Sequence, residues 1–153
     1  MRSMYWSARF ALGLALLLGL TAIAALSTPG SASAQQAASA TTAKIIIHKA
    51  ECPATTTNLF ASCHDNRLAG VGFTVAGVSR HTDANGVVSW GPSAGSQYIH
   101  EFSTVFNTNG KAYVYCKDQT SGVVLFDGRT TTGNIRITTT AGHVTICDWY
   151  NLT

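Results

Sequence analysis

Residues 143–151 constrain the fold of this chain more than any other stretch. Five of these nine residues are β-branched or aromatic, types that favour a pleated, half-buried strand. Side chains alternate between the two faces of a strand, so one face carries Thr145, Cys147, Trp149 and Asn151. Trp149 is too large to expose cheaply to water, and its face is therefore expected to point into the core. An inward Asn151 needs a partner, because a buried unpaired amide costs roughly 2–7 kcal/mol.

The same kind of segment recurs along the chain, with turn residues between the segments. Strand signals lie at residues 44–49, 68–75, 86–90, 98–102, 112–116, 123–126, 135–139 and 144–150. The pair Asn85-Gly86 indicates a tight turn, and Ala141-Gly142 indicates a hairpin. No stretch beyond residue 34 has a convincing helical period. The pattern predicts an all-β fold, a single sandwich of about seven or eight strands over residues 44–153.

The first 34 residues have the pattern of a secretory signal peptide. Arg2 and Arg9 give a positively charged start, an apolar run follows over residues 10–26, and a small-residue Ala-Ser-Ala site ends at Ala34. Cleavage is expected after Ala34, with residues 35–43 forming a flexible lead-in to the domain. An uncleaved membrane anchor is the alternative, and the small-residue site argues against it. The sequence therefore predicts a secreted, extracellular protein.

The charge of the predicted mature chain excludes several classes of function. Of ten Lys and Arg, two fall in the signal peptide, which leaves eight against seven Asp and Glu and a formal charge of +1. No basic patch suggests nucleic-acid binding. No second apolar run is long enough to span a bilayer. The five histidines lack metal-ligand spacing, and neither a metal nor another cofactor is predicted.

The predicted mature part contains all four cysteines of the chain. An even number of cysteines in a small secreted domain indicates a disulfide framework. Two disulfides allow three pairings among Cys52, Cys63, Cys116 and Cys147. Cys52–Cys63, which closes a local loop, and Cys116–Cys147, which joins two strands, are the favoured pairs.

Three polar residues lie in phase with apolar ones on different predicted strands. Lys49 shares a face with two isoleucines of the first strand, Glu101 shares a face with Ile99, and Asn151 shares a face with Trp149. Taken singly, Lys49 could reach water from the strand end and Glu101 could be a solvated edge residue. Burial of all three side chains in one shared site would explain why each is in phase with apolar residues.

Several segments of the chain match a known pattern in the right order. They are Ile45-Ile46-Ile47-His48-Lys49, Leu68-Ala69-Gly70-Val71-Gly72-Phe73, Thr82-Asp83-Ala84-Asn85-Gly86, Gly95 to Glu101 and Trp149-Tyr150-Asn151. In these segments the sequence resembles the Cna-B-type domains of bacterial surface proteins, also called prealbumin-like or SpaA-like domains. The resemblance implies an immunoglobulin-like or prealbumin-like sandwich and a structural or adhesive surface role rather than an enzyme. The expected partner is an unidentified extracellular protein or carbohydrate.

In many members of that family a lysine and an asparagine form an isopeptide bond with the help of a glutamate. Carried over by position, these residues are Lys49, Asn151 and Glu101. Three features depart from the family pattern, and one is the absence of the usual proline-glycine-tyrosine segment after the glutamate. Tyr98 lies three residues before Glu101, where the family has its tyrosine four before, and there is no Leu-Pro-x-Thr-Gly sorting signal. The family's usual covalent route to the cell wall is therefore not expected.

Two other functions stay open from the sequence. A secreted module that binds a carbohydrate or a host protein could use the loops at one end of the sandwich. A small hydrolase is the weaker alternative, because no nucleophile-elbow motif accompanies His64-Asp65. The identity of the partner and the oligomeric state are not indicated by any residue pattern.

Overall fold

A computed structural model of the chain describes residues 41–102 and 111–153. The predicted signal peptide and residues 35–40 of the predicted lead-in lie outside this part. Within it, Thr42 pairs with Ser93 in an isolated bridge and Ala43 is buried. Strand-like pairing among the described residues therefore begins at Thr42, two residues before β1.

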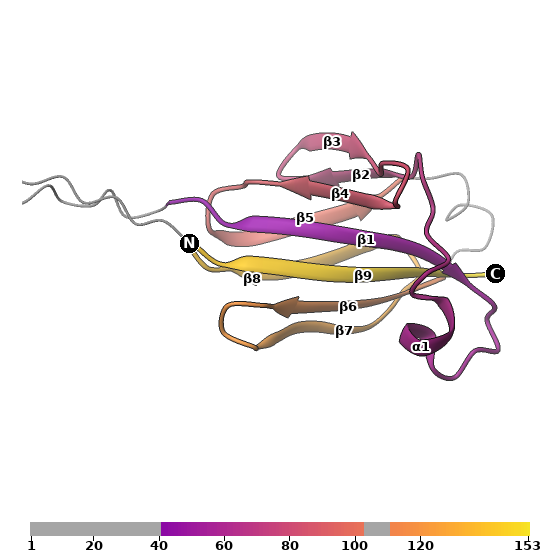
Figure 1. Ribbon diagram of the computed structural model, residues 1–153. Helices are drawn as coiled ribbons and strands as arrows, with labels where there is room; N and C mark the ends of the chain where they lie inside the picture. The colour runs from indigo at the N-terminus through magenta and orange to yellow at the C-terminus, as the bar shows by residue number, and fades with distance from the viewer. Residues whose placement is uncertain (1–40, 103–110) are drawn as a thin grey trace, which may run out of the picture. The chain divides into compact units, whose positions relative to one another are not determined.

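The described residues form nine strands and one short helix (Figure 1). These elements are β1 (Lys44–Cys52), α1 (Leu59–Cys63), β2 (Gly72–Val75), β3 (Val78–His81), β4 (Val87–Trp90), β5 (Gly95–Glu101), β6 (Ala112–Asp118), β7 (Val124–Thr130), β8 (Asn134–Thr139) and β9 (Val144–Leu152). The predicted all-β sandwich is confirmed, with one strand more than expected. No helix of the described residues has the length and apolar character needed to cross a membrane.

Two sheets make up the sandwich. The strand order is β4-β1-β9-β6-β7 in the first sheet and β3-β2-β5-β8 in the second. β1 and β9 are parallel neighbours at the centre of the first sheet, and the other pairings in both sheets are antiparallel. The first and last strands of the domain thus lie side by side (Figure 1).

The core lies between the sheets and follows the alternation predicted from the sequence. Residues 145, 147, 149 and 151 of β9 are all buried, with Trp149 fully inaccessible. The ring of Phe73, from β2 in the second sheet, meets the Trp149 ring edge-on at 5.2 Å between centroids. Such edge-to-face pairs add to the apolar burial that holds two sheets together.

The turn before β4 fixes the position of Lys49. The Asp83 carboxylate accepts hydrogen bonds from the backbone N–H groups of Asn85 and Val87, both at 2.9 Å. Gly86 then takes a positive φ of 68°, and its carbonyl accepts from the Lys49 N–H at 2.8 Å. A Cβ at residue 86 would lie 2.8 Å from the Lys49 carbonyl oxygen, so the close approach requires glycine.

Candidate functional site

Lys49 and Asn151 project from adjacent strands onto the same side of the first sheet. In the parallel register of β1 and β9, Lys49 lies opposite Trp149, and Glu51 lies opposite Asn151. Residues in register on neighbouring strands point to the same face, and alternate residues of a strand share that face. Because Trp149 points into the core, Lys49 and Asn151 point there too, as diagonal neighbours.

Glu101 reaches the same point from the opposite sheet. It is the last residue of β5 and lies opposite Phe73 of β2. Its Oε1 accepts a hydrogen bond of 2.9 Å from the Asn151 side-chain Nδ2 and lies 3.9 Å from the Lys49 Nζ. The structure therefore brings together all three polar residues that the sequence analysis grouped.

These three side chains are completely shielded from water. Lys49, Glu101 and Asn151 each have an exposed fraction of 0%. Burial lowers the pKa of the Lys49 ammonium from 10.5 to about 8, while the carboxylates of Glu101 and Glu51 act in the opposite direction. At pH 7 roughly a tenth of the amine is thus neutral, and hence nucleophilic, far more than for an exposed lysine.

The Lys49 amine and the Asn151 amide are not fully occupied by hydrogen bonds, so both could take part in a reaction between them. Lys49 Nζ donates to the backbone carbonyl of its neighbour Ala50 at 2.8 Å. Asn151 Oδ1 is buried and has no hydrogen-bond partner among the described residues. A half-turn of the amide would place Oδ1 against Glu101, so the Glu101 carboxyl group is positioned to exchange protons with the Asn151 amide.

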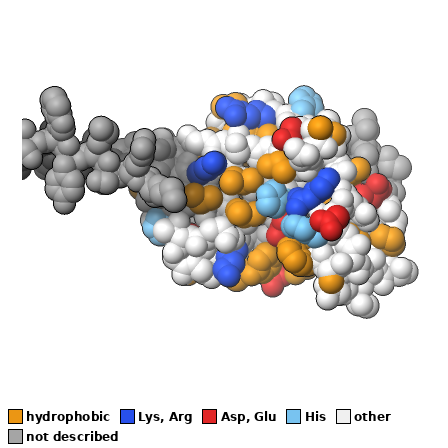
Figure 2. Space-filling model, in the orientation of Figure 1, with side chains coloured by type: hydrophobic (Ala, Val, Ile, Leu, Met, Phe, Trp, Pro, Cys, Tyr) orange, Lys and Arg blue, Asp and Glu red, His pale blue; other side chains and the backbone are white. Residues whose placement is uncertain are grey.

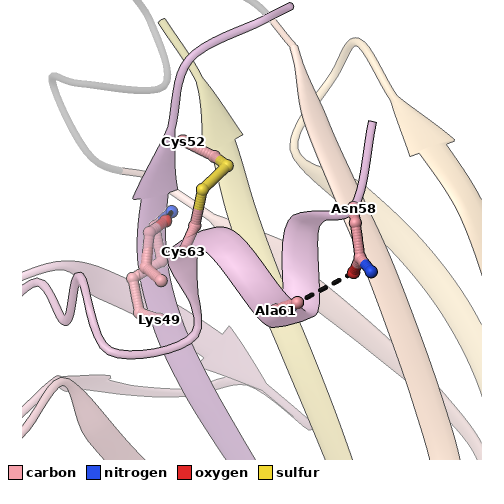
Figure 3. Close-up of a disulfide and its surroundings, with 6 residues drawn as sticks. Lys49, Cys52, Asn58, Ala61 and Cys63 are labelled. Atoms are coloured by element: carbon pink, nitrogen blue, oxygen red, sulfur yellow. Dashed lines mark hydrogen bonds between the residues drawn. A yellow bond between two sulfur atoms is a disulfide. The ribbon is translucent and has the colours of Figure 1, made fainter. Parts of the chain in front are cut away.

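The cysteines pair as the sequence analysis favoured. One disulfide joins Cys52, the last residue of β1, to Cys63, the last residue of α1 (Figure 3). The other joins Cys116 of β6 to Cys147 of β9, directly opposite each other in the register. The first disulfide holds the segment between β1 and α1 against the sheet, and the second links two neighbouring strands of it.

The sequence analysis missed a cluster of polar side chains on the outer face of the first sheet. His48 Nδ1 lies 3.1 Å from Asp148 Oδ1, and His64 Nδ1 lies 3.9 Å from the same oxygen. The Arg67 guanidinium donates to His64 Nε2 at 2.7 Å. Figure 2 shows histidine, basic and acidic side chains gathered on this face. The spacing of these residues in the sequence gives no signal, because the register of β1 and β9 and the position of α1 bring them together.

Among the described residues, no group of three or more His, Cys, Asp or Glu side chains is arranged to hold a metal ion.

In the comparisons with known proteins, no family model and no curated protein matches the chain. Solved structures that resemble it include the major pilin from Streptococcus pyogenes and its N168A mutant. In both cases the identity is 8%, the match covers 73% of this chain and the TM-score is 0.39. The match covers 48% of each pilin chain, so this chain spans about half the length of those structures.

Proposed function

We propose that this chain is a secreted structural or adhesive module of a bacterial surface, in which Lys49 and Asn151 become joined by an isopeptide bond. The observation that supports it is the meeting of Lys49, Glu101 and Asn151 in one fully buried site between the sheets. A buried lysine and a buried glutamate are costly to fold, and a covalent amide would remove the titrating amine altogether.

The proposed reaction balances without any external reagent. The neutral Lys49 Nζ attacks Cγ of the Asn151 amide, whose oxygen accepts a hydrogen bond from the protonated Glu101. A bond forms between Nζ and Cγ, and the bond from Cγ to Nδ2 breaks. Glu101 transfers a proton to the departing nitrogen and regains one from Nζ, so that ammonia leaves. The reaction occurs once per chain and is a self-modification.

The intact mass of the secreted protein tests this proposal after complete reduction of the disulfides. The wild-type chain is expected to weigh one ammonia less than its sequence, and Glu101→Ala should have the full mass while remaining folded. Glu51→Ala is the matched control, because Glu51 is a carboxylate on the same strand and face as Lys49 but is only half-buried, whereas Glu101 is completely buried and accepts the Asn151 hydrogen bond. It should keep the wild-type loss of ammonia.

A second source of the same mass loss has to be removed. Cleavage after Ala34 would leave Gln35 as the first residue, and an N-terminal glutamine can cyclise with loss of ammonia. All variants should therefore carry Gln35→Ser. A proteolytic digest should then contain a branched peptide that joins the Lys49 and Asn151 segments. A full-mass wild-type chain, or an ammonia loss without this branched peptide, would contradict the proposed bond.

A further inference from the structure

An open cavity of about 790 Å³ lies on the outer face of the first sheet, outside the buried site. Its floor follows from the strand register. Tyr113 of β6 lies between Arg129 of β7 and Tyr150 of β9, and Tyr115 of β6 lies opposite Asp148 of β9. Three tyrosine side chains, one cation and one anion therefore form a continuous surface. The cavity volume is within the range of small-molecule sites.

The wall of the cavity is formed by residues 54–58, which connect β1 to α1, and by the first two residues of α1, Leu59 and Phe60. The Cys52–Cys63 disulfide ties both ends of this segment to the sheet (Figure 3). Asn58 Oδ1 accepts from the Ala61 N–H at 3.1 Å, which leaves the two amide hydrogens of Asn58 as donors. Phe60 also lines the cavity and is 60% exposed, an unusual position for a phenylalanine.

Tyr150 gives an independent indication of a ligand. Its side chain lines the cavity and is 2% exposed, yet its hydroxyl has no hydrogen-bond partner among the described residues. Burial raises the pKa of this phenol to about 12, so the hydroxyl keeps its proton and remains a donor. A buried donor without an acceptor is unfavourable, and a ligand oxygen would satisfy it.

The charges of the cavity favour a neutral ligand. Of the described residues that line it, Arg129 and Asp148 are charged at neutral pH, and their charges cancel. The remaining polar atoms are hydroxyl and amide groups of Thr55, Thr56, Thr57 and Asn58, beside aromatic rings. A sugar ring suits this combination, because it has a face of C–H groups for a tyrosine ring and a rim of hydroxyls for the polar side chains.

We propose that this cavity binds a neutral oligosaccharide, with the Tyr115 ring stacked on a sugar ring and with Asp148, Arg129 and Asn58 bound to hydroxyl groups. The Tyr150 hydroxyl donates to a ligand oxygen at the base of the cavity. This site is separate from the Lys49–Glu101–Asn151 site, and it binds sugar whether or not the isopeptide bond forms.

The test is a titration of the ¹⁵N-labelled, disulfide-bonded domain, followed by amide chemical shifts. The probes are maltotriose, cellotriose and tri-N-acetylchitotriose as neutral sugars, with 3′-sialyllactose as the acidic one. At least one neutral trisaccharide should shift the amides of residues 54–60 and of β6. Tyr115→Ala should weaken its binding by about tenfold or more, and Tyr150→Phe by about threefold to tenfold.

Tyr98→Ala is the matched control, because Tyr98 is 50% exposed on the second sheet and does not line the cavity. Its affinity should equal that of the wild type, and all variants should keep the dispersed spectrum of a folded domain. Absence of shifts with all three neutral sugars would overturn the proposal. So would unchanged affinity in Tyr115→Ala, or binding of the sialylated probe alone, which would indicate an anion site at Arg129.

Discussion

Replacement of Lys49 by methionine should change stability in a direction that depends on whether the isopeptide bond exists. Methionine fills much of the space of the lysine stem. Glu101→Gln is introduced with it, because Lys49→Met alone would leave the Glu101 carboxylate buried without its ion-pair partner at 3.9 Å, which is destabilising by itself. If Lys49 were a free amine in the wild type, removal of both buried ionisable groups would be neutral or stabilising, as for other buried ion pairs replaced by uncharged residues. If Lys49 is joined to Asn151, the same pair of substitutions removes a cross-link and must destabilise the domain.

The expected loss follows from the loop that the bond would close. Residues 49 to 151 form a loop of roughly 100 residues, for which chain-entropy arguments give about 4.7 kcal/mol. The two disulfides shorten the flexible path, but the dependence on length is logarithmic and lowers this value by less than about 1 kcal/mol. For a domain of about 110 residues, a loss of 4 kcal/mol corresponds to a fall in Tm of roughly 15–20 °C.

Thermal unfolding followed by circular dichroism measures this loss, with the disulfides intact. Lys44→Met is the control, since Lys44 is exposed on the same strand, and its effect should stay within about 0.5 kcal/mol. A Lys49→Met/Glu101→Gln domain with a Tm equal to or above that of the wild type would refute the cross-link, even if Lys49 and Asn151 are neighbours.

Three further predictions concern the surroundings of the site. In Asn151→Ala, where Lys49 remains a free amine, the folded-state pKa of about 8 lies below the ordinary 10.5, so the unfolded chain binds more protons between these values. The free energy of unfolding should therefore be lowest below pH 8 and should rise by up to about 3 kcal/mol towards pH 10.5. Urea unfolding at pH 7.5 and 9.5 should show this rise in Asn151→Ala, and the control Lys49→Met/Asn151→Ala should lack it. The cysteines of the second disulfide are 31 residues apart, and its removal by Cys116→Ala/Cys147→Ala should lower the free energy of unfolding by about 3–4 kcal/mol. Urea unfolding measures this loss, and an unchanged midpoint would exclude a stabilising role. Gly86→Ala should lower the free energy of unfolding by about 1–3 kcal/mol, because φ is positive there and the new Cβ meets the Lys49 carbonyl. Gly122→Ala is also at positive φ but has open space around it, so it should show only the smaller cost of the backbone conformation.

The buried site could be predicted because each of its residues breaks a local apolar pattern. Lys49, Glu101 and Asn151 are each in phase with an isoleucine or tryptophan, and strand alternation carries that information over one or two positions. The distance of Glu101 from the other two could not be predicted in this way, because it depends on how the two sheets pack. Tyr98, whose position departs from the family pattern, points outward, and Gln97 occupies the inward position four residues before Glu101.

The elements that the sequence analysis missed are those without a periodic signal. α1 has five residues, too few to show a helical period. All four residues of β3 are exposed, so no apolar alternation marks it. Strand alternation puts Tyr150 on the face opposite Trp149, the outer face of the first sheet, and it is buried there because Leu59 and Cys63 of α1 pack with it. That cover depends on the Cys52–Cys63 disulfide and cannot be inferred from β9 alone.

The parallel pairing of β1 and β9 also determines how the domain would bear a mechanical load. Nine register pairs connect the two strands, from Lys44 opposite Val144 to Cys52 opposite Leu152. A force that enters at the start of β1 and leaves at the end of β9 acts along both strands and pulls them past each other in shear. Their hydrogen bonds then resist together instead of opening one after another, as they would if peeled apart from one end. A covalent link between Lys49 and Asn151 would divert tension from one strand directly to the other, so that most of the domain would carry no load.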